Sequence, residues 1–212
     1  MPAYYPVFLD LKGRLCVVIG GGAVAERKVA ALLECGARVR VVAPRVTTPL
    51  RRWAQEGRVE HLARAYSAGD LQGALIAIAG TDDRSTNAEV YREAQGLGVL
   101  VNMVDDPDHC SFIAPALIRR GEVQIAVSTG GASPALARHL RQRLEKAVPP
   151  EYEPLAGLLG RVRRRLRREG KTPSPEAWQA AIDEDLLALV RQESWAAAEA
   201  RLLEQLRAAA AS

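Results

Sequence analysis

Leu15-Cys-Val-Val-Ile19, followed by Gly20-Gly-Gly-Ala-Val-Ala25, is the stretch of sequence that decides the fold. Five apolar residues run into three glycines, and apolar residues then recur at helical spacing, which predicts a strand, a tight turn and a helix. Gly20, Gly22 and Ala25 match the pattern G-x-G-x-x-G/A. Gly20 permits the sharp turn, Gly22 lets the backbone approach a pyrophosphate, and Ala25 lets the helix pack closely on the sheet. The stretch predicts a dinucleotide site with the phosphates at the helix N-terminus.

The alternative for this stretch is a glycine turn that serves only packing. The strand before it and the helix after it are the context that the dinucleotide motif requires, and they favour a cofactor. Further strands are expected at 38–43, 59–62, 75–79 and 99–104, and helices at 50–56 and 87–95, the second capped by Ser85 or Thr86. This alternation predicts an α/β fold with a Rossmann-like, doubly wound parallel sheet.

The pattern changes after this sheet. A short segment at 116–120 leads into a strand at 123–128, and Ser133 and Pro134 begin a helix that Pro149 and Pro150 end. The remainder is rich in Ala, Leu and Arg and is expected to be helical. We therefore predict an NAD-binding Rossmann domain over 1–114, a small α+β dimerisation region over 115–150 and a helical C-terminal domain over 151–212.

Composition narrows the class of protein. Hydrophobic residues make up 48% and charged residues 25% of the 212 residues, as in soluble globular proteins. No apolar run approaches the roughly 20 residues of a membrane helix. The first ten residues have no basic region of the kind that opens a signal peptide, so a cytoplasmic location without membrane partners is expected. The three cysteines have no C-x-x-C spacing, which argues against a disulfide framework and a metal site.

The segment 161–171 is strongly basic, with six arginines and one lysine against one glutamate. It has the charge to bind nucleic acid, and a nucleotide-sensing regulatory module is one alternative function. The segment has no interleaved aromatic residues and no DNA-binding motif. A solvated helix face, or a partner for carboxylates, is the preferred interpretation, and no nucleic-acid partner is expected.

Several candidate residues follow strands of the predicted sheet, where ligands of open α/β sheets bind. Pro44 and Arg45 occupy the place of the acid that normally holds the ribose, so the residues leave NAD and NADP open. Asp105 follows the strand at 99–104 and can meet a nicotinamide and a substrate; a turn cap ahead of Pro107 is the alternative. His109 is a candidate acid, base or ligand, or simply a polar loop residue.

A second group of candidates suits an anion. Small hydroxylated residues and glycines precede the helix at Pro134, a combination that favours carboxylate or phosphate binding over a simple turn. Two arginines nearby can add charge, or lie solvated in a turn. These residues are Arg119, Arg120, Ser128, Thr129, Gly130, Gly131 and Ser133.

Five segments in order resemble the precorrin-2 dehydrogenase family, which comprises the N-terminal module of sirohaem synthases and its stand-alone relatives. The similarity covers about residues 4–150. The segments are Gly20-Gly-Gly-Ala-Val-Ala-Glu-Arg-Lys28, Thr81-Asp-Asp83, Asn102-Met-Val-Asp-Asp-Pro107, Ser111-Phe-Ile113 with Pro115, and Val127-Ser-Thr-Gly-Gly-Ala-Ser-Pro134.

The resemblance implies NAD-dependent oxidation of precorrin-2, a polycarboxylate tetrapyrrole, to sirohydrochlorin for sirohaem or cobalamin, and in some members insertion of ferrous iron. It also implies a homodimer and makes Asp105 the essential aspartate. The residues that it places around the dinucleotide are Ala23, Val24, Pro44 and Arg45, with Asn102 and Val104 nearby. Gly20, Gly22 and Ala25 of the glycine pattern, together with Thr81, complete the predicted cofactor site. The resemblance maps the family's serine-rich turn to residues 128–133, which include Ser128, Thr129, Gly130, Gly131 and Ser133. His109, Ser111, Arg119 and Arg120 complete the residues predicted to face the substrate. Thr129 stands where a serine often occurs in the family.

Another nicotinamide-dependent oxidoreductase on the same scaffold is a further alternative, because fold does not dictate substrate. The segments at 102–105 and 128–134 disfavour it. No segment indicates the methyltransferase module of longer sirohaem synthases.

Overall fold

A computed structural model describes residues 4–210, which form two compact units, one ending at Ala114 and one beginning at Pro115. Residues 1–3, part of the segment predicted to carry no signal peptide, lie outside the described residues. The domain boundary expected at residue 150 stays a prediction.

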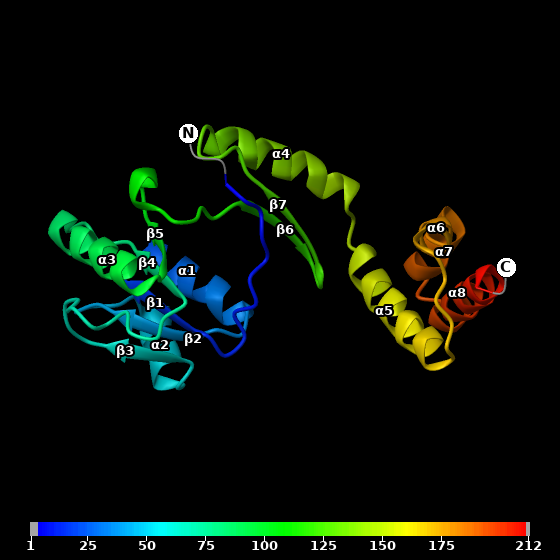
Figure 1. The fold of residues 1–212 in the computed structure, drawn as a ribbon, viewed down its shortest axis with the longest axis horizontal. Helices are drawn as coiled ribbons and strands as arrows, with labels where there is room; N and C mark the ends of the chain where they lie inside the picture. The colour runs from blue at the N-terminus through cyan, green and yellow to red at the C-terminus, as the bar shows by residue number, and fades with distance from the viewer. Residues whose placement is uncertain (1–3, 211–212) are drawn as a thin grey trace. The chain divides into compact units, whose positions relative to one another are not determined.

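The first unit is built on a parallel five-stranded sheet of order β3-β2-β1-β4-β5 (Figure 1). β1 is central, and the chain adds β2 and β3 on one side of it before crossing to β4 and β5 on the other. This confirms the predicted doubly wound fold. The bounds are β1 Leu15–Ile19, α1 Ala23–Glu34, β2 Arg38–Val42, α2 Thr48–Gln55, β3 Val59–Leu62, β4 Ile76–Ala79, α3 Arg84–Leu97, β5 Leu100–Met103 and the short helix η1 Pro107–His109.

Both faces of the sheet are covered, which explains why the central strands β1 and β4 are apolar throughout rather than alternating. In β1, Cys16 and Val18 belong to a core that includes Val29 of α1 and Leu50 of α2, whereas Val17 and Ile19 belong to a core on the α3 side. These four side chains of β1 are at most 1% exposed. Because both faces of the sheet are covered, a ligand can reach it only at the loops that follow the strands.

The predicted cap of α3 was wrong. The helix begins at Arg84, and its N-cap is Asp83, whose carboxylate accepts hydrogen bonds from the Ser85 amide at 2.9 Å and the Thr86 hydroxyl at 2.6 Å. Hydrogen bonds from Thr86 and Ser85 lower the pKa of Asp83 to about 2. Ser85 and Thr86 are thus hydrogen-bond donors to the N-cap residue and not the N-cap itself. The Asp83 carboxylate can accept both of these bonds at once.

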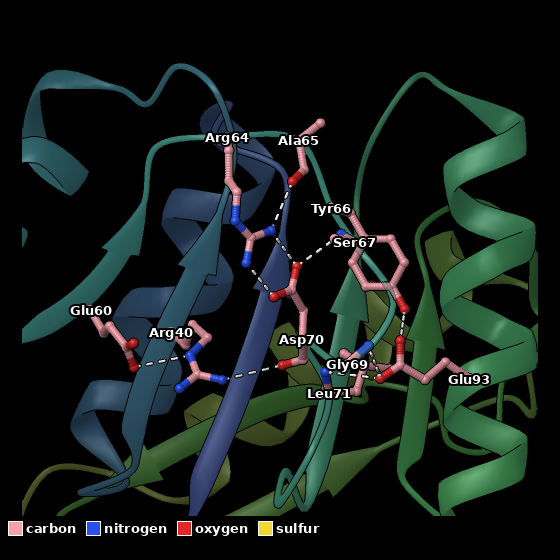
Figure 2. A network of polar contacts seen from close by, with 10 residues as sticks. All are labelled: Arg40, Glu60, Arg64, Ala65, Tyr66, Ser67, Gly69, Asp70, Leu71 and Glu93. Carbon is pink, nitrogen blue, oxygen red and sulfur yellow. Dashed lines mark hydrogen bonds and ion pairs between the residues drawn. The ribbon is translucent and has the colours of Figure 1, made fainter.

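An irregular loop, residues 63–75, joins β3 to β4 where a doubly wound fold usually has a helix. Figure 2 shows the polar network that holds this loop. The Asp70 carboxylate accepts hydrogen bonds from both Arg64 Nη atoms, at 2.6 and 2.7 Å, and from the Ser67 amide at 2.9 Å. Glu93 of α3 accepts the Gly69 amide at 3.0 Å, as well as the Leu71 amide and the Tyr66 hydroxyl. Hydrogen bonds to the Asp70 and Glu93 carboxylates therefore hold this connection in place, where a packed helix would usually do so.

Asp70→Asn is expected to lower the free energy of unfolding by about 1–3 kcal/mol at pH 7, because a buried acceptor of charged hydrogen bonds is lost. The Asp70 side chain is 7% exposed, and its hydrogen bonds with Arg64 hold its pKa below the ordinary 3.8. A depressed folded-state pKa means that this stability is present above the unfolded pKa and is lost as pH falls through the folded one. Urea unfolding should show the wild-type advantage narrowing below about pH 4; an advantage that does not change with pH would contradict this account.

The second unit begins with an antiparallel hairpin, β6 Ala116–Arg120 and β7 Val123–Val127, on which the helix α4, Pro134–Ala147, packs. The segment at 116–120 is thus a full strand. The helices α5 Tyr152–Arg168, α6 Pro175–Ala180, α7 Glu184–Arg191 and α8 Trp195–Ala209 follow and bury a core of their own. No helix within residues 4–210 is long and apolar enough to cross a membrane. A cytoplasmic location stays a prediction.

Candidate active site

The carboxyl ends of four strands meet at one edge of the sheet in the first unit. Ile19, the last residue of β1, pairs with Val42 of β2 and Ala79 of β4, and Ala79 pairs with Met103 of β5. The loops that follow these strands therefore start side by side. β1 lies at the point where the chain order reverses, which is where open α/β sheets bind their ligands.

The three glycines after β1 have different surroundings. Gly20 has φ +116°, and a Cβ there would lie 2.6 Å from the Gly80 carbonyl oxygen. A Cβ on Gly21 would lie 2.0 Å from the Arg45 carbonyl oxygen. A Cβ on Gly22 would meet no described atom within 4 Å. Gly20 and Gly21 therefore serve the packing of loops against one another, whereas Gly22 borders open space that a ligand can enter.

The N-terminus of α1 faces this open space. Gly22 is the N-cap, and none of the described side chains hydrogen-bonds to the cap of this helix. Ala25 is only 2% exposed and packs into the sheet core, while Ala23 is exposed. An N-terminus that no side chain caps, beside a glycine with room before it, fits the phosphates of a dinucleotide. Val24 follows Ala23 in the first turn of the helix.

The loop after β2 is fixed by backbone contacts. The Thr47 amide donates to the Gly21 carbonyl at 3.0 Å, and His61 Nε2 donates to the Ala43 carbonyl at 2.9 Å. Pro44 and Arg45 are exposed beside this anchored backbone. Sequence reasoning missed His61, since only the pairing of β3 with β2 brings it to this loop.

The loops after β4 and β5 complete the edge. The Thr81 hydroxyl donates to Asn87 Oδ1 at 3.0 Å, and Asn87 Nδ2 donates back to the Thr81 carbonyl at 3.0 Å. The Val104 amide donates to the Ala79 carbonyl at 2.8 Å, and a Cβ on Gly80 would lie 3.3 Å from Val104 Cγ2. Thr81 and Val104 thus lie at this edge of the sheet, and Thr81 is bonded to α3; their contacts with a cofactor stay predictions.

Asn102 is turned into the protein. It is 9% exposed, and its Nδ2 donates to the Phe112 carbonyl at 3.0 Å. This amide therefore holds the segment that follows η1. Its role toward the cofactor stays a prediction.

Asp105 has an unusual backbone. Its φ is 61°, its side chain is exposed, and no other described residue hydrogen-bonds to its carboxylate. A left-handed non-glycine residue costs roughly 1 kcal/mol or more and commonly marks a functional site. At the carboxyl end of β5, the turn presents a carboxylate that has no partner among residues 4–210.

The Cys110 side chain contacts the backbone on both sides of Asp105. The Met103 amide donates to its Sγ at 3.2 Å, and the thiol lies 3.2 Å from the Asp106 carbonyl. Burial is the main cause that raises the pKa of Cys110, so it stays a thiol able to donate. Sequence reasoning counted this residue only as a cysteine without a metal-binding spacing.

His109 and Ser111 are both engaged near the turn. His109 Nδ1 lies 2.8 Å from Asp106 Oδ2, and its ring meets Tyr91 edge to face at 4.7 Å. Ser111 Oγ accepts the Val101 amide at 3.0 Å, which places it beside the middle of β5 rather than beyond its end. Their predicted contacts with substrate stay predictions.

The hydroxyls of the turn between β7 and α4 hold that turn together. Thr129 Oγ1 accepts the Ser133 amide at 2.9 Å, Ser128 Oγ accepts the Gly130 amide at 3.0 Å, and Ser133 Oγ caps α4 through the Leu136 amide at 3.2 Å. Gly130 and Gly131 have φ +64° and +90°. An anion at this turn would therefore compete with bonds already made.

The two arginines at the end of β6 also have protein surroundings. Arg120 donates to the Val148 carbonyl at 3.2 Å and pairs with Glu145 at 3.5 Å, so it ties β6 to the end of α4. Arg119 is half-buried. Both belong to the second unit, as do residues 128–133, whereas the dinucleotide loops and Asp105 belong to the first.

Fold and site together define a Rossmann protein that binds a nicotinamide dinucleotide. The family model "Putative NAD(P)-binding" matches residues 7–116, and "Sirohaem biosynthesis protein central" matches residues 120–147. The chain belongs to the putative NAD(P)-binding family, and this match together with that of the sirohaem biosynthesis central region confirms the resemblance.

Relatives and solved structures agree with this membership. The sirohaem synthase of Nitrosococcus oceani is 41% identical over 94% of this chain and 44% of its own length. That of Pseudomonas aeruginosa is 47% identical over 77% of this chain and 35% of its own length. The chain thus spans less than half of these relatives. The structure of SirC, a precorrin-2 dehydrogenase, superposes with a TM-score of 0.73 at 28% identity over 91% of this chain and 96% of that one.

Proposed function

We propose that this protein catalyses the NAD-dependent oxidation of precorrin-2 to sirohydrochlorin. The observation that carries the proposal is the exposed Asp105 carboxylate, held at φ 61° beyond β5, on the same sheet edge as the dinucleotide loop. The similarity to sirohaem synthases and to a precorrin-2 dehydrogenase supports this substrate.

The oxidation removes a hydride and a proton from the substrate. When bound, the nicotinamide supplies the hydride acceptor. Gly22 and the start of α1 hold the phosphates, and β4 separates the β1 loop from the β5 loop. Asp105 accepts the proton, because it is a carboxylate with no competing hydrogen bond from the described residues.

We propose NAD rather than NADP as the cofactor. Arg45 is the one basic residue in the sequence 43–48, and it is exposed. An exposed ion pair contributes about 0–1 kcal/mol, too little for Arg45 alone to select a 2′-phosphate strongly. Comparing kcat/KM for the two cofactors checks this step.

Cys110→Ala is expected to lower kcat by about tenfold with little change in the Kd of NAD. Without Sγ, the Met103 amide and the Asp106 carbonyl lose the group that fixes the turn, and Asp105 loses its orientation. Cys16→Ala, at a cysteine outside the turn, is the control for a general loss of stability. A Cys110→Ala enzyme with wild-type kcat would remove Cys110 from the positioning of Asp105.

We further propose a homodimer formed through α4. Leu136, Leu140 and Leu144 recur every four residues along this helix and are 48%, 37% and 41% exposed. Leu117 of β6, in the same unit, is 38% exposed. Large apolar side chains lined up in this way favour a protein interface over solvent.

Leu140→Glu is expected to convert the dimer to a monomer in light scattering, because a carboxylate buried at an interface without a partner is strongly unfavourable. Gln142→Glu places the same charge on an exposed site of the same helix, away from the leucines, and should leave the mass unchanged. A dimer that survives Leu140→Glu would place the interface elsewhere.

Ferrous iron, as a second substrate, is the remaining activity suggested by the family. Within residues 4–210, no group of three or more His, Cys, Asp or Glu side chains is arranged to hold a metal ion. The experiment that tests the function is a visible-spectrum assay with precorrin-2, run with NAD, with NADP and without cofactor, followed by ferrous or cobalt ion. Sirohydrochlorin formation only with a nicotinamide cofactor supports the proposal, and oxidation of another substrate alone would favour a different oxidoreductase.

A further inference from the structure

A groove in the second unit combines apolar walls with cations. It has a volume of about 680 Å³ and lies between α5, the 171–175 loop and α6. Leu159, Pro173 and Trp178 contribute apolar surface, and Arg163, Arg167 and Lys171 contribute charge. The volume is within the range of small-molecule sites, which is roughly 300–1,000 Å³.

The three cations of this groove have no acidic partners. Some of the other arginines of the helical region are neutralised: Arg165 pairs with Glu199 at 3.3 Å, and Arg207 with Glu169 at 2.6 Å. By contrast, Arg163, Arg167 and Lys171 make no ion pair or side-chain hydrogen bond with any other residue in 4–210. Arg163 and Arg167 are four residues apart in α5, about 6 Å along the helix axis on one side of the groove, and Lys171 follows the end of the helix.

The walls of the groove are fixed by the way α5 ends. Gly170 has φ +69°, and the Lys171 amide donates to the Leu166 carbonyl at 2.9 Å, which returns the chain toward the helix. Two prolines follow, and Ser174 caps α6 through the Ala177 amide at 3.2 Å. Since proline fixes φ, this wall needs little ordering when a ligand binds.

We propose that this groove binds a tetrapyrrole polycarboxylate, the chemistry shared by precorrin-2 and sirohydrochlorin. A partly exposed indole and leucine side chains accept the face of a macrocycle, and a row of unpaired cations meets the carboxylates at its edge. The choice of ligand rests on the proposed function, but the groove shares no residue with the dinucleotide loops or with Asp105.

The test uses uroporphyrin, an aromatic tetrapyrrole polycarboxylate, titrated into the full chain without NAD and followed by its absorption and fluorescence. R163Q/R167Q/K171Q should weaken binding by about tenfold or more. The matched control, R161Q/R164Q/R168Q, removes three exposed charges of α5 that do not line the groove and should stay within about twofold of wild type. Circular dichroism verifies that both variants fold.

Equal weakening by both triple variants would overturn the proposal, since it would indicate attraction to a basic helix as a whole. Unchanged binding in R163Q/R167Q/K171Q would also overturn it. So would displacement of uroporphyrin by equimolar random-sequence duplex DNA, which would identify a nucleic-acid site. Because no cofactor or turnover enters the measurement, a failure of precorrin-2 oxidation leaves the binding result interpretable.

Discussion

Asp105→Asn is expected to lower kcat for precorrin-2 oxidation by about 10²- to 10⁴-fold while the Kd of NAD changes by less than about twofold. The amide keeps the size of the side chain and, as a residue that tolerates positive φ, keeps the turn at φ 61°. It cannot accept the proton that leaves the substrate. The loss should therefore be in the chemical step and not in cofactor binding.

Asp108→Asn is the matched control for this variant. Asp108 is exposed in the neighbouring η1 helix and lacks the left-handed backbone of Asp105, so its neutralisation should leave kcat unchanged. Single-turnover absorbance measures the chemical step, and fluorescence titration measures NAD binding. Asp105→Asn with at least half of the wild-type kcat would remove Asp105 from the mechanism.

Gly22→Ala is expected to weaken NAD binding by about 5- to 150-fold with no loss of stability. The φ of Gly22 is −83°, which alanine adopts freely, and its Cβ would meet no described atom within 4 Å. The added methyl group would instead occupy the space that a pyrophosphate needs. Crowding of a packed site by one methyl group costs about 1–3 kcal/mol, which corresponds to that range of affinity.

Two other glycines make this prediction specific. Gly20→Ala would combine φ +116° with a Cβ 2.6 Å from the Gly80 carbonyl oxygen, so it should lower Tm as well as affinity. Gly96→Ala, within α3 and without close neighbours, should lower neither. Calorimetric titration with NAD and thermal unfolding separate the three cases. Wild-type affinity in Gly22→Ala would mean that the phosphates lie elsewhere.

The sheet and its carboxyl edge were predictable because they rest on local pattern. Apolar runs of strand length, such as 15–19, and the glycines that follow are visible within a few residues. The loop at 63–75 was not, since the Arg64–Asp70 pair and the reach of Glu93 to this loop exist only in the folded chain. Charges of this kind look solvated in a sequence.

Position in the sequence predicts roles for Gly22 and Asp105, and these roles stay predictions. The bond of Cys110 to the Met103 amide could not be predicted, because it follows from the turn, which a sequence does not show. Thr129 and Arg120 were predicted as candidates for an anion site, with a simple turn as the alternative. Thr129 is bonded to Ser133, because short polar side chains readily bond to the adjacent backbone. Arg120 of β6 is paired with Glu145 of α4, a contact that exists only in the folded chain.

The central claim is that this chain transfers one hydride from precorrin-2 to NAD on the edge that carries Gly22 and Asp105. The most direct measurement mixes excess enzyme and NAD with a known amount of precorrin-2 and records NADH and sirohydrochlorin together. The account predicts that the two products appear at the same rate and in equal amounts. Sirohydrochlorin that forms without an equal amount of NADH would contradict it.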